Sequence, residues 1–175
     1  MRINIIGLSL LFFMVAGCKN EEKFKGFLVL FNDTTTNKFG YKNQQGAIII
    51  PQGKYEFCFT DTFKTYAIVS MPGVGLVAID RKEKVLFKVF SFDNGPDYPS
   101  EGLFRIIENN KIGFADAASG VVLIKPQFDC AFPFEEGKAK VSKNCKIHAE
   151  GEHSEWQSDD WFFIDKTGKQ VGNLN

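Results

Sequence analysis

Short apolar segments alternate with polar turn residues along most of the chain. From position 26 to position 175 the apolar segments are rich in Phe, Val and Ile, and Asp, Asn or Gly recur between them. Aromatic and β-branched residues favour pleated strands, whereas Asp, Asn and Gly favour tight turns. Stretches rich in Ala and Leu, which favour helices, are few. The pattern therefore predicts an all-β domain over residues 26–175, built from antiparallel strands and hairpins.

One arrangement of these residues occurs four times. In each copy an apolar segment leads to an Asp or Asn, a tight turn follows, and a second apolar segment begins. The turn-opening residues are Asn43, Asp80, Asp116 and Asp165, at spacings of 37, 36 and 49 residues. Asp and Asn open turns because their side chains accept a backbone hydrogen bond from two residues on, and a closing Gly adopts positive φ without steric cost. Since Glu83 replaces the closing Gly in the second copy, we expect a looser turn there.

A second arrangement recurs downstream of these turns. Pro126-Gln127-Phe128-Asp129 is followed by the segment from Phe132 to Val141, and the segment from Tyr98 to Ile106 parallels it. The latter leads into Asn109-Asn110, which separates two apolar segments. Two asparagines suit a two-residue primed turn, so we expect a β-hairpin around them.

Together the two arrangements resemble the WG-repeat family of bacterial proteins. The resemblance is strongest from Lys111 to Val141, and partial copies extend over Phe39 to Ile106 and Trp161 to Val171. In this chain the Trp-Gly pair that gives the family its name is replaced by Phe39-Gly40 and Ile112-Gly113. The resemblance implies a degenerate array of antiparallel repeats, either closed like a propeller or open, and it implies no particular activity.

Repeats of this length bury their apolar side chains only by packing against their neighbours. Because the chain ends soon after the fourth turn, we expect the segment from Phe27 to Phe31 to lie beside Gln170-Val171 and to close or cap the array. We expect one continuous core between the repeats, built by Phe57, Phe87, Phe104, Phe114, Phe128 and Phe162.

The amino-terminal segment has a different pattern. Arg2 supplies a positive charge, and an almost uninterrupted apolar run extends from Ile3 to Ala16. This run is shorter than the roughly 20 residues of a membrane-spanning helix, and the combination is typical of a secretory signal peptide. The run ends in Val15-Ala16-Gly17-Cys18, which resembles the lipobox of bacterial lipoproteins. That resemblance implies cleavage before Cys18 and a covalent lipid (diacylglycerol and acyl chains such as palmitate) on its sulfur. The alternative is an ordinary signal peptide with an incidental cysteine.

These features divide the chain into a lipoprotein signal peptide (residues 1–17), a polar tether (residues 18–25) and the repeat domain (residues 26–175). Lys19 stands after the cysteine, where aspartate would be a retention signal in enteric bacteria, and this resemblance implies the outer membrane. Glu21-Glu22 resembles the surface-export signals of some Bacteroidetes lipoproteins. We therefore expect a cell-envelope protein that the lipid holds to a membrane, on its periplasmic or surface face.

Charge excludes one class of partner. The chain has 21 basic and 21 acidic side chains, and the basic ones form no cluster. Proteins that bind nucleic acids usually have an excess or a stripe of basic residues, so we expect no nucleic-acid partner. Apart from the covalent lipid, we expect no cofactor.

Three cysteines remain after lipidation of Cys18: Cys58, Cys130 and Cys145. Export places them where disulfides persist. Their odd number leaves at least one free or paired between chains. Cys130 and Cys145 are the favoured pair because they are close in sequence on either side of a strand, although sequence alone leaves the other pairings open.

The polar segment between the third and fourth repeats concentrates metal-binding residue types. It contains both histidines of the protein, and Cys145, His148, Glu150 and His153 are all types that bind zinc. Their spacing matches no established zinc motif. The segment is therefore either a metal site formed by these four residues or a solvated excursion from the sheet, with Cys145 in a disulfide.

The connection between the second and third repeats is long, acidic and aromatic. Loops on a rigid scaffold often carry binding residues. The alternative is a plain connection between repeats. The residues of the candidate recognition loop are Asp93, Asn94, Asp97, Tyr98 and Glu101.

No catalytic motif is present in the sequence. It contains no Gly-x-Ser-x-Gly elbow, no phosphate-binding loop and no dinucleotide motif, and the recurrent aspartates are explained by their turns. We therefore expect a binding or scaffolding module for a protein or a glycan rather than an enzyme, because stacked repeats present extended surfaces. The alternatives are a metal-dependent envelope hydrolase that uses His148 and His153, and an immunity-type inhibitor lipoprotein directed at a toxin or an enzyme.

Overall fold

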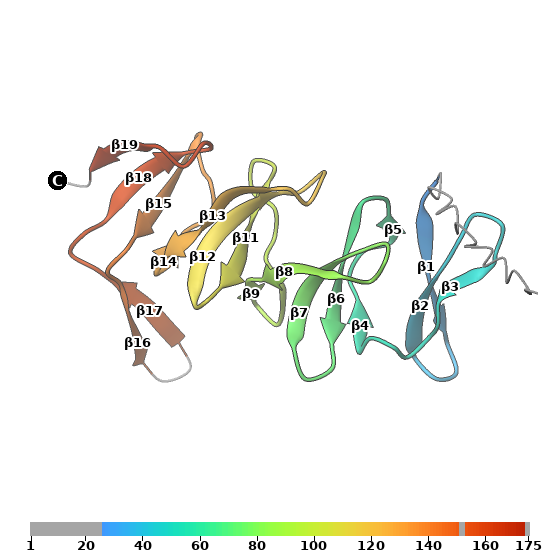
Figure 1. Cartoon of the computed structure of the whole chain (residues 1–175). Coiled ribbons are helices and arrows are strands. Elements are labelled where there is room, and N and C mark those ends of the chain that lie inside the picture. The colour runs from blue at the N-terminus through green and yellow to red at the C-terminus, as the bar shows by residue number, and fades with distance from the viewer. Residues whose placement is uncertain (1–25, 151–152, 174–175) are drawn as a thin grey trace, which may run out of the picture.

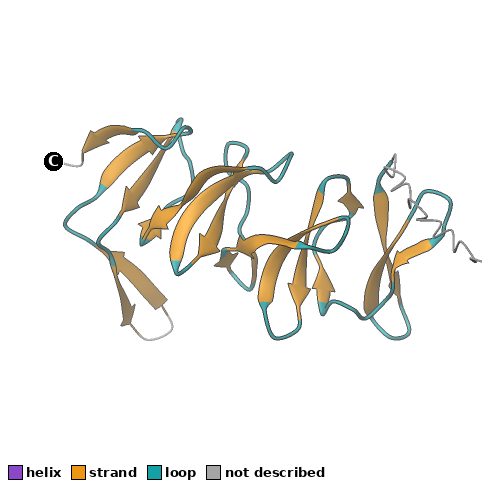
Figure 2. Cartoon of the chain, in the orientation of Figure 1, coloured by secondary structure: helices purple, strands orange, loops and turns teal. Residues whose placement is uncertain are grey.

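A computed structural model describes residues 26–150 and 153–173, and this part of the chain is all-β (Figure 2). The prediction of an all-β domain of antiparallel strands is confirmed. In the described residues no helix is long and apolar enough to cross a membrane. The predicted signal peptide (residues 1–17) and the predicted tether (residues 18–25), which includes Cys18, lie outside the described residues.

Four three-stranded antiparallel meanders, here called units 1 to 4, follow one another along the array (Figure 1). Each predicted turn joins the second and third strands of one unit. The strands are β1 (Leu28–Asp33), β2 (Lys38–Lys42) and β3 (Ile48–Ile50) in unit 1, β6 (Tyr66–Met71), β7 (Gly75–Asp80) and β8 (Val85–Val89) in unit 2, β11 (Leu103–Glu108), β12 (Lys111–Asp116) and β13 (Val122–Phe128) in unit 3, and β15 (Lys138–Ser142), β18 (Phe162–Asp165) and β19 (Gln170–Asn173) in unit 4.

Short strands connect or interrupt the units. Two of them form a hairpin between units 2 and 3, and two form a longer hairpin inserted into unit 4. These strands are β4 (Phe57–Cys58), β5 (Thr62–Phe63), β9 (Ser91–Phe92), β10 (Gly95–Pro96), β14 (Cys130–Ala131), β16 (Lys146–Glu150) and β17 (His153–Gln157).

Each unit is joined to the next by the same kind of pairing. The chain that leaves a unit pairs with the first strand of the following unit, as β4 does with β6 and β14 does with β15. Between units 2 and 3 the end of β8 makes this pairing, with Val89 opposite Ile106 of β11. Units 2 and 3 thus share a seven-stranded sheet in the order β13-β12-β11-β8-β7-β6-β4, while units 1 and 4 have four-stranded sheets of their own.

The array is open. We expected the segment from Phe27 to Phe31 to pair near Gln170-Val171, and this expectation was wrong. Strand β1 pairs with β2 on one edge and with β5 on the other, so neither edge is free to accept β19. Figure 1 shows β1 and β19 at opposite ends of the array. The second partner of β1 is β5, which lies in the connection that follows unit 1. Within the described residues, the first and last units are therefore not paired with each other.

Three of the four turns share one hydrogen-bond pattern, in which the side chain accepts from two residues on, as the sequence predicted. In units 1, 2 and 4 the Oδ1 atom of the turn-opening residue accepts the backbone N–H groups two and four residues on. The backbone carbonyl of the same residue accepts the N–H three residues on. The turn of unit 3 is one residue longer, so Asp116 accepts from Ser119 and Gly120 instead. The common pattern explains why Asp and Asn recur at these positions.

The turn without glycine is as tight as the others. Glu83 adopts a φ of 61° and donates its N–H to the carbonyl of Asp80, so the expected looser turn is not present. Side-chain contacts offset the strain of a left-handed non-glycine residue. The Glu83 carboxylate accepts a hydrogen bond from Tyr55 at 2.8 Å and pairs with Lys54 at 2.7 Å.

The predicted asparagine turn is confirmed. Asn109 and Asn110 have φ angles of 50° and 60°, and Glu108 pairs with Lys111 across them. Positive φ at both central residues defines the type I′ turn, which matches the twist of the strands it joins.

Over residues 26–150 and 153–173 the apolar core consists of three clusters rather than the single continuous core that we expected. One cluster joins units 1 and 2 around Tyr41 and Phe63, and another joins units 3 and 4 around Phe114 and Phe134. The third surrounds Phe104 on the shared sheet. Of the six phenylalanines expected inside, Phe57 is exposed and packs against Phe39 and Phe59 at the surface.

Candidate functional site

The two hairpins that interrupt the regular array border one depression, which we call the aromatic groove. Its volume is about 1040 Å³. The connection through β9 and β10 forms one side, and the inserted hairpin β16–β17 contributes Ile147, Glu155 and Trp156. The aromatic residues of the groove are Phe90, Phe92, Tyr98, Phe132 and Trp156, and its ionisable residues are Asp93, Asp97, Arg105 and Glu155.

Aromatic contacts hold the inserted hairpin against the array. The Trp156 ring meets Phe90 edge-on at a centroid distance of 5.9 Å and Phe132 at 5.3 Å. Phe132 in turn packs against Trp161 at 5.5 Å. Edge-to-face pairs at such distances are favourable because the positive ring edge faces the negative ring face. Trp156 therefore joins the connection between units 2 and 3 to the connection between units 3 and 4 in one wall of the groove.

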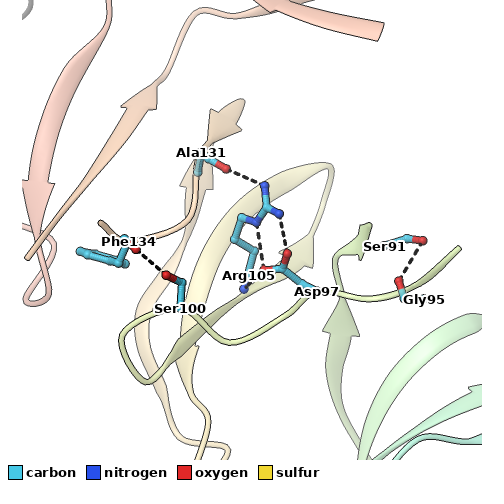
Figure 3. A network of polar contacts seen from close by, with 7 residues as sticks. All are labelled: Ser91, Gly95, Asp97, Ser100, Arg105, Ala131 and Phe134. Carbon is cyan, nitrogen blue, oxygen red and sulfur yellow. Dashed lines mark hydrogen bonds and ion pairs between the residues drawn. The ribbon is translucent and has the colours of Figure 1, made fainter. Parts of the chain in front are cut away.

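A buried ion pair between Arg105 and Asp97 lies next to the Phe90 ring, and Figure 3 shows its hydrogen bonds. Arg105 and Asp97 are each only 4% exposed. The Arg105 Nε donates to Asp97 Oδ2 at 2.9 Å, its Nη2 donates to Asp97 Oδ1, and its Nη1 donates to the carbonyl of Ala131 at 3.1 Å. The backbone N–H of Arg105 also donates to Asp97 Oδ2, at 2.8 Å. This network holds the connection after β10 against β11. Removing either partner would leave a buried charge unpaired, which is strongly unfavourable.

A cation lies above the equivalent phenylalanine at two successive junctions between units. The backbone N–H groups of Phe90 and Phe132 donate to the carbonyls of Arg105 and Lys140, so the two pairs occupy equivalent positions. The Arg105 guanidinium lies 4.2 Å from the Phe90 ring, and the Lys140 ammonium lies 5.6 Å from the Phe132 ring. Both distances are within the range of cation–π attraction.

The residues of the predicted recognition loop have different positions and contacts in the structure. Asp93, Asp97 and Tyr98 line the groove. Asn94 forms the β9–β10 turn, with a φ of 62°. Asp97 serves the internal ion pair, whereas Tyr98 is 69% exposed and free to contact a ligand.

Glu101 has a different role from the one predicted. Its carboxylate accepts the N–H of Gly137 at 3.1 Å and pairs with Lys166 at 3.1 Å. The Lys166 ammonium and the Gly137 hydrogen bond hold the pKa of Glu101 below its usual value. Glu101 thus links unit 3 to unit 4 and does not line the groove.

A disulfide anchors the base of the inserted hairpin. Cys130 of β14 is bonded to Cys145, just before β16, with a Cα–Cα distance of 5.8 Å. Ser158 closes the other side by donating from its hydroxyl to the carbonyl of Asn144 at 2.8 Å. Among the cysteines of the described residues Cys58 is free, and burial raises the pKa of its thiol to about 11.

The predicted metal set is not assembled in the described residues. Cys145 is engaged in the disulfide and is no thiolate ligand while that bond is intact. The strand register places His148 opposite Glu155, and Glu150 opposite His153. The side chains of Glu150 and His153 lie outside the described residues, and among those described no group of three His, Cys, Asp or Glu residues could hold a metal ion.

Sequence patterns did not point to four of the groove residues: Phe90, Arg105, Phe132 and Trp156. A signal for two of them exists in the repeats. Phe90 and Phe132 occupy equivalent positions, and Phe59 stands at that position in the connection between units 1 and 2, where its N–H donates to the carbonyl of Ile68 in β6. Only the contact across the inserted hairpin identifies Trp156 as part of the same site.

Comparison with known proteins agrees with the repeat geometry. Residues 112–146 match the family model of the WG containing repeat. The chain carries a WG-type repeat. The matched stretch covers β12, β13, β14 and β15, and it overlaps the segment from Lys111 to Val141 in which the sequence most resembled this family. No curated protein and no solved structure matches the chain.

Proposed function

We propose that the protein is a lipid-anchored binding module of the cell envelope, which holds a partner in the aromatic groove. The observation that carries this proposal is the meeting of two hairpins, distant in sequence, at one apolar depression. Tyr98 and Phe92 are 69% and 52% exposed there. Clustered exposed aromatic side chains are typical of interaction sites because they exclude water over a large area when a partner covers them.

The array serves this role as a scaffold. Units 3 and 4 present the groove on sheets that are fixed by the Arg105–Asp97 pair and the Cys130–Cys145 disulfide. A pre-ordered surface loses less conformational entropy on binding than a mobile one. The lipid predicted on Cys18 would keep the groove close to a membrane.

The proposal is tested by affinity capture from crosslinked cells that produce the full chain. We expect one specific envelope partner with the wild type and with Ile48→Ala, an exposed apolar position in unit 1. The same partner is lost with Tyr98→Ala, because the substitution removes the most exposed ring of the groove. It is also lost with Cys18→Ala if the anchor is required. Equal capture by Tyr98→Ala and Ile48→Ala would refute the groove as the binding site.

A metal-dependent hydrolase is the competing proposal. The observation that favours it is the pairing of His148 with Glu155, both residue types that bind zinc, in the β16–β17 register. Stoichiometric zinc in the purified protein, lost in a His148→Ala variant together with a hydrolytic activity, would favour this alternative over the binding module.

A further inference from the structure

Most side-chain hydrogen-bond donors of the aromatic groove are already used by the protein itself. Every terminal nitrogen of Arg105 is bonded, to Asp97 or to the carbonyl of Ala131. The Ser100 hydroxyl donates to the carbonyl of Phe134 at 2.6 Å, and the Ser91 hydroxyl to the carbonyl of Gly95 at 3.4 Å (Figure 3). Among the described lining residues, the Tyr98 hydroxyl and the Trp156 indole N–H are the side-chain donors left for a ligand.

Two carboxylate acceptors of the groove, in contrast, remain available to a ligand. Within the described part of the chain, the carboxylates of Asp93 and Glu155 have no hydrogen-bond or ion-pair partner, and both residues are exposed. The Asp97 charge is neutralised by Arg105. The groove thus carries uncompensated negative charge from its two rims, Asp93 in the β9–β10 turn and Glu155 in β17. Such a site attracts positively charged groups.

The rings of the groove suit the same kind of ligand. Aromatic faces attract cations through the ring quadrupole. The protein uses this attraction beside the groove, where the Arg105 guanidinium lies 4.2 Å from the Phe90 ring and 5.8 Å from the Phe92 ring. The Lys140 ammonium lies 4.6 Å from the Trp161 ring. The exposed rings of Phe92 and Tyr98 offer further faces of this kind.

We propose that the aromatic groove binds a cationic side chain, arginine or lysine, of a partner protein. This inference rests on the proposed binding function and names its ligand chemistry. A guanidinium or ammonium group supplies only donors, and the groove offers acceptors and ring faces. A neutral glycan presents hydroxyls that need donors as well as acceptors. Arg105, Ser91 and Ser100 are engaged, so Tyr98 and Trp156 supply the remaining side-chain donors of the described groove residues. The cation would sit between the carboxylates of Asp93 and Glu155, against Tyr98.

The test uses the full chain in a non-ionic detergent and two blocked peptides, acetyl-Gly-Arg-Gly-amide and its citrulline counterpart. Citrulline has the shape of arginine without its charge. The chain has two tryptophans, so the Trp156 indole N–H signal is assigned in a nitrogen-15 NMR spectrum by comparison with Trp161→Phe. We expect the arginine peptide to shift the Trp156 signal in a saturable manner, with weaker binding at high salt. The citrulline peptide should leave the signal in place.

A charge-removing variant makes the test specific. Asp93→Asn with Glu155→Gln should weaken binding of the arginine peptide roughly threefold to tenfold, since two exposed ion pairs are lost. The matched control is Glu108→Gln with Asp159→Asn, which removes two exposed carboxylates outside the groove and should leave binding unchanged.

The outcomes separate the two proposals. Equal shifts with arginine and citrulline, or stronger shifts with neutral chitotriose, would overturn the cationic ligand. If the cellular partner is still lost with Tyr98→Ala but retained with Asp93→Asn and Glu155→Gln, the groove binds a partner of other chemistry. If Tyr98→Ala has no effect on capture, the binding function of the groove itself fails.

Discussion

At the scale of single residues, two glycines show why the repeat needs a residue without a side chain. Gly40 and Gly113 stand three positions before the turn-opening residue of their units. A Cβ at Gly113 would lie 2.4 Å from the carbonyl oxygen of Ile124 and 2.5 Å from the nitrogen of Pro126, and a Cβ at Gly40 would lie 2.7 Å from the carbonyl oxygen of Ile50. Neither glycine has positive φ. The requirement is therefore space for the third strand of the unit, rather than backbone freedom.

Gly113→Ala is expected to destabilise the protein by about 2 kcal/mol, because backbone atoms of β13 must move to admit the methyl group. Gly172→Ala is the matched control, since a Cβ there meets no atom within 4 Å. Urea unfolding followed by tryptophan fluorescence measures both. Equal unfolding midpoints for the two variants would contradict the close-approach explanation.

At the scale of elements, the turns use either a charged or a neutral acceptor for the same bonds. The Asp165 Oδ1 atom accepts from the hydroxyl of Thr167 at 2.6 Å and from two backbone N–H groups. The Thr167 hydroxyl bond contributes most to holding the pKa of Asp165 below its usual value. Asn43 makes the equivalent backbone bonds in unit 1 without a charge. The turns of units 1 and 4 should therefore respond differently to acid.

Asp165→Asn is expected to reduce the loss of stability in acid. Because the pKa of Asp165 is lower in the folded state than in the unfolded state, its contribution is present above the unfolded pKa of about 3.9 and is lost as the pH falls through the lower, folded value. The difference in urea midpoint between pH 6 and pH 2.5 should shrink in Asp165→Asn.

Asn43→Asp is the reciprocal variant, and it should enlarge the same difference by adding a turn carboxylate in unit 1. If both variants respond to acid like the wild type, the turn carboxylates do not set the acid sensitivity.

The inserted hairpin depends on its covalent anchor. Cys130 and Cys145 close a short loop, with a sequence separation of 15 residues. Their bond holds the base of the β16–β17 hairpin beside β14. Trp156 of this hairpin contacts Phe132 in the groove. The disulfide therefore connects the stability of unit 4 with the shape of the groove.

Replacing both Cys130 and Cys145 with alanine is expected to lower the free energy of unfolding by about 3 kcal/mol, the entropy of closing a loop of this length. The tryptophan emission should also move to longer wavelength as Trp156 loses its contacts with Phe90 and Phe132. Cys58→Ala serves as the control for loss of a cysteine, and its emission should stay unchanged because Cys58 lies in the cluster between units 1 and 2. Unchanged stability in the double variant would mean that the bond is not formed in solution.

At the scale of the whole molecule, the array has two different ends. Unit 1 is completed by β5, and unit 4 ends in β19, whose partner in the described residues is β18. Neighbouring units interact through the junction pairings and the clusters between them. In such an array stability is roughly a sum over units and junctions.

Small-angle X-ray scattering should show an elongated particle. A compact domain of about 150 residues has a radius of gyration of about 15 Å. The open array of Figure 1 predicts a clearly larger value and an asymmetric distance distribution. A value near 15 Å with a symmetric distribution would indicate a closed ring of repeats.

The sequence by itself determined the local features of this protein. Asn43, Asp80, Asp116 and Asp165 open their turns through bonds to their own backbone neighbours. Asn109-Asn110 likewise forms its primed turn from its own conformational preference. Such features are predictable because every group involved lies within a few residues of the others.

Only the tertiary structure decided the open array and the groove. The alternation of apolar and polar residues fixes which face of a strand is buried, but it does not fix which strand lies beside it. The pairing of β1 with β5, the burial of Asp97 against Arg105 and the contact of Trp156 with Phe90 all join segments whose proximity depends on this choice. The predicted recognition loop therefore identified Tyr98 and Asp93 as groove residues, while the wall that faces them came from a hairpin that the sequence presented as a metal-site candidate.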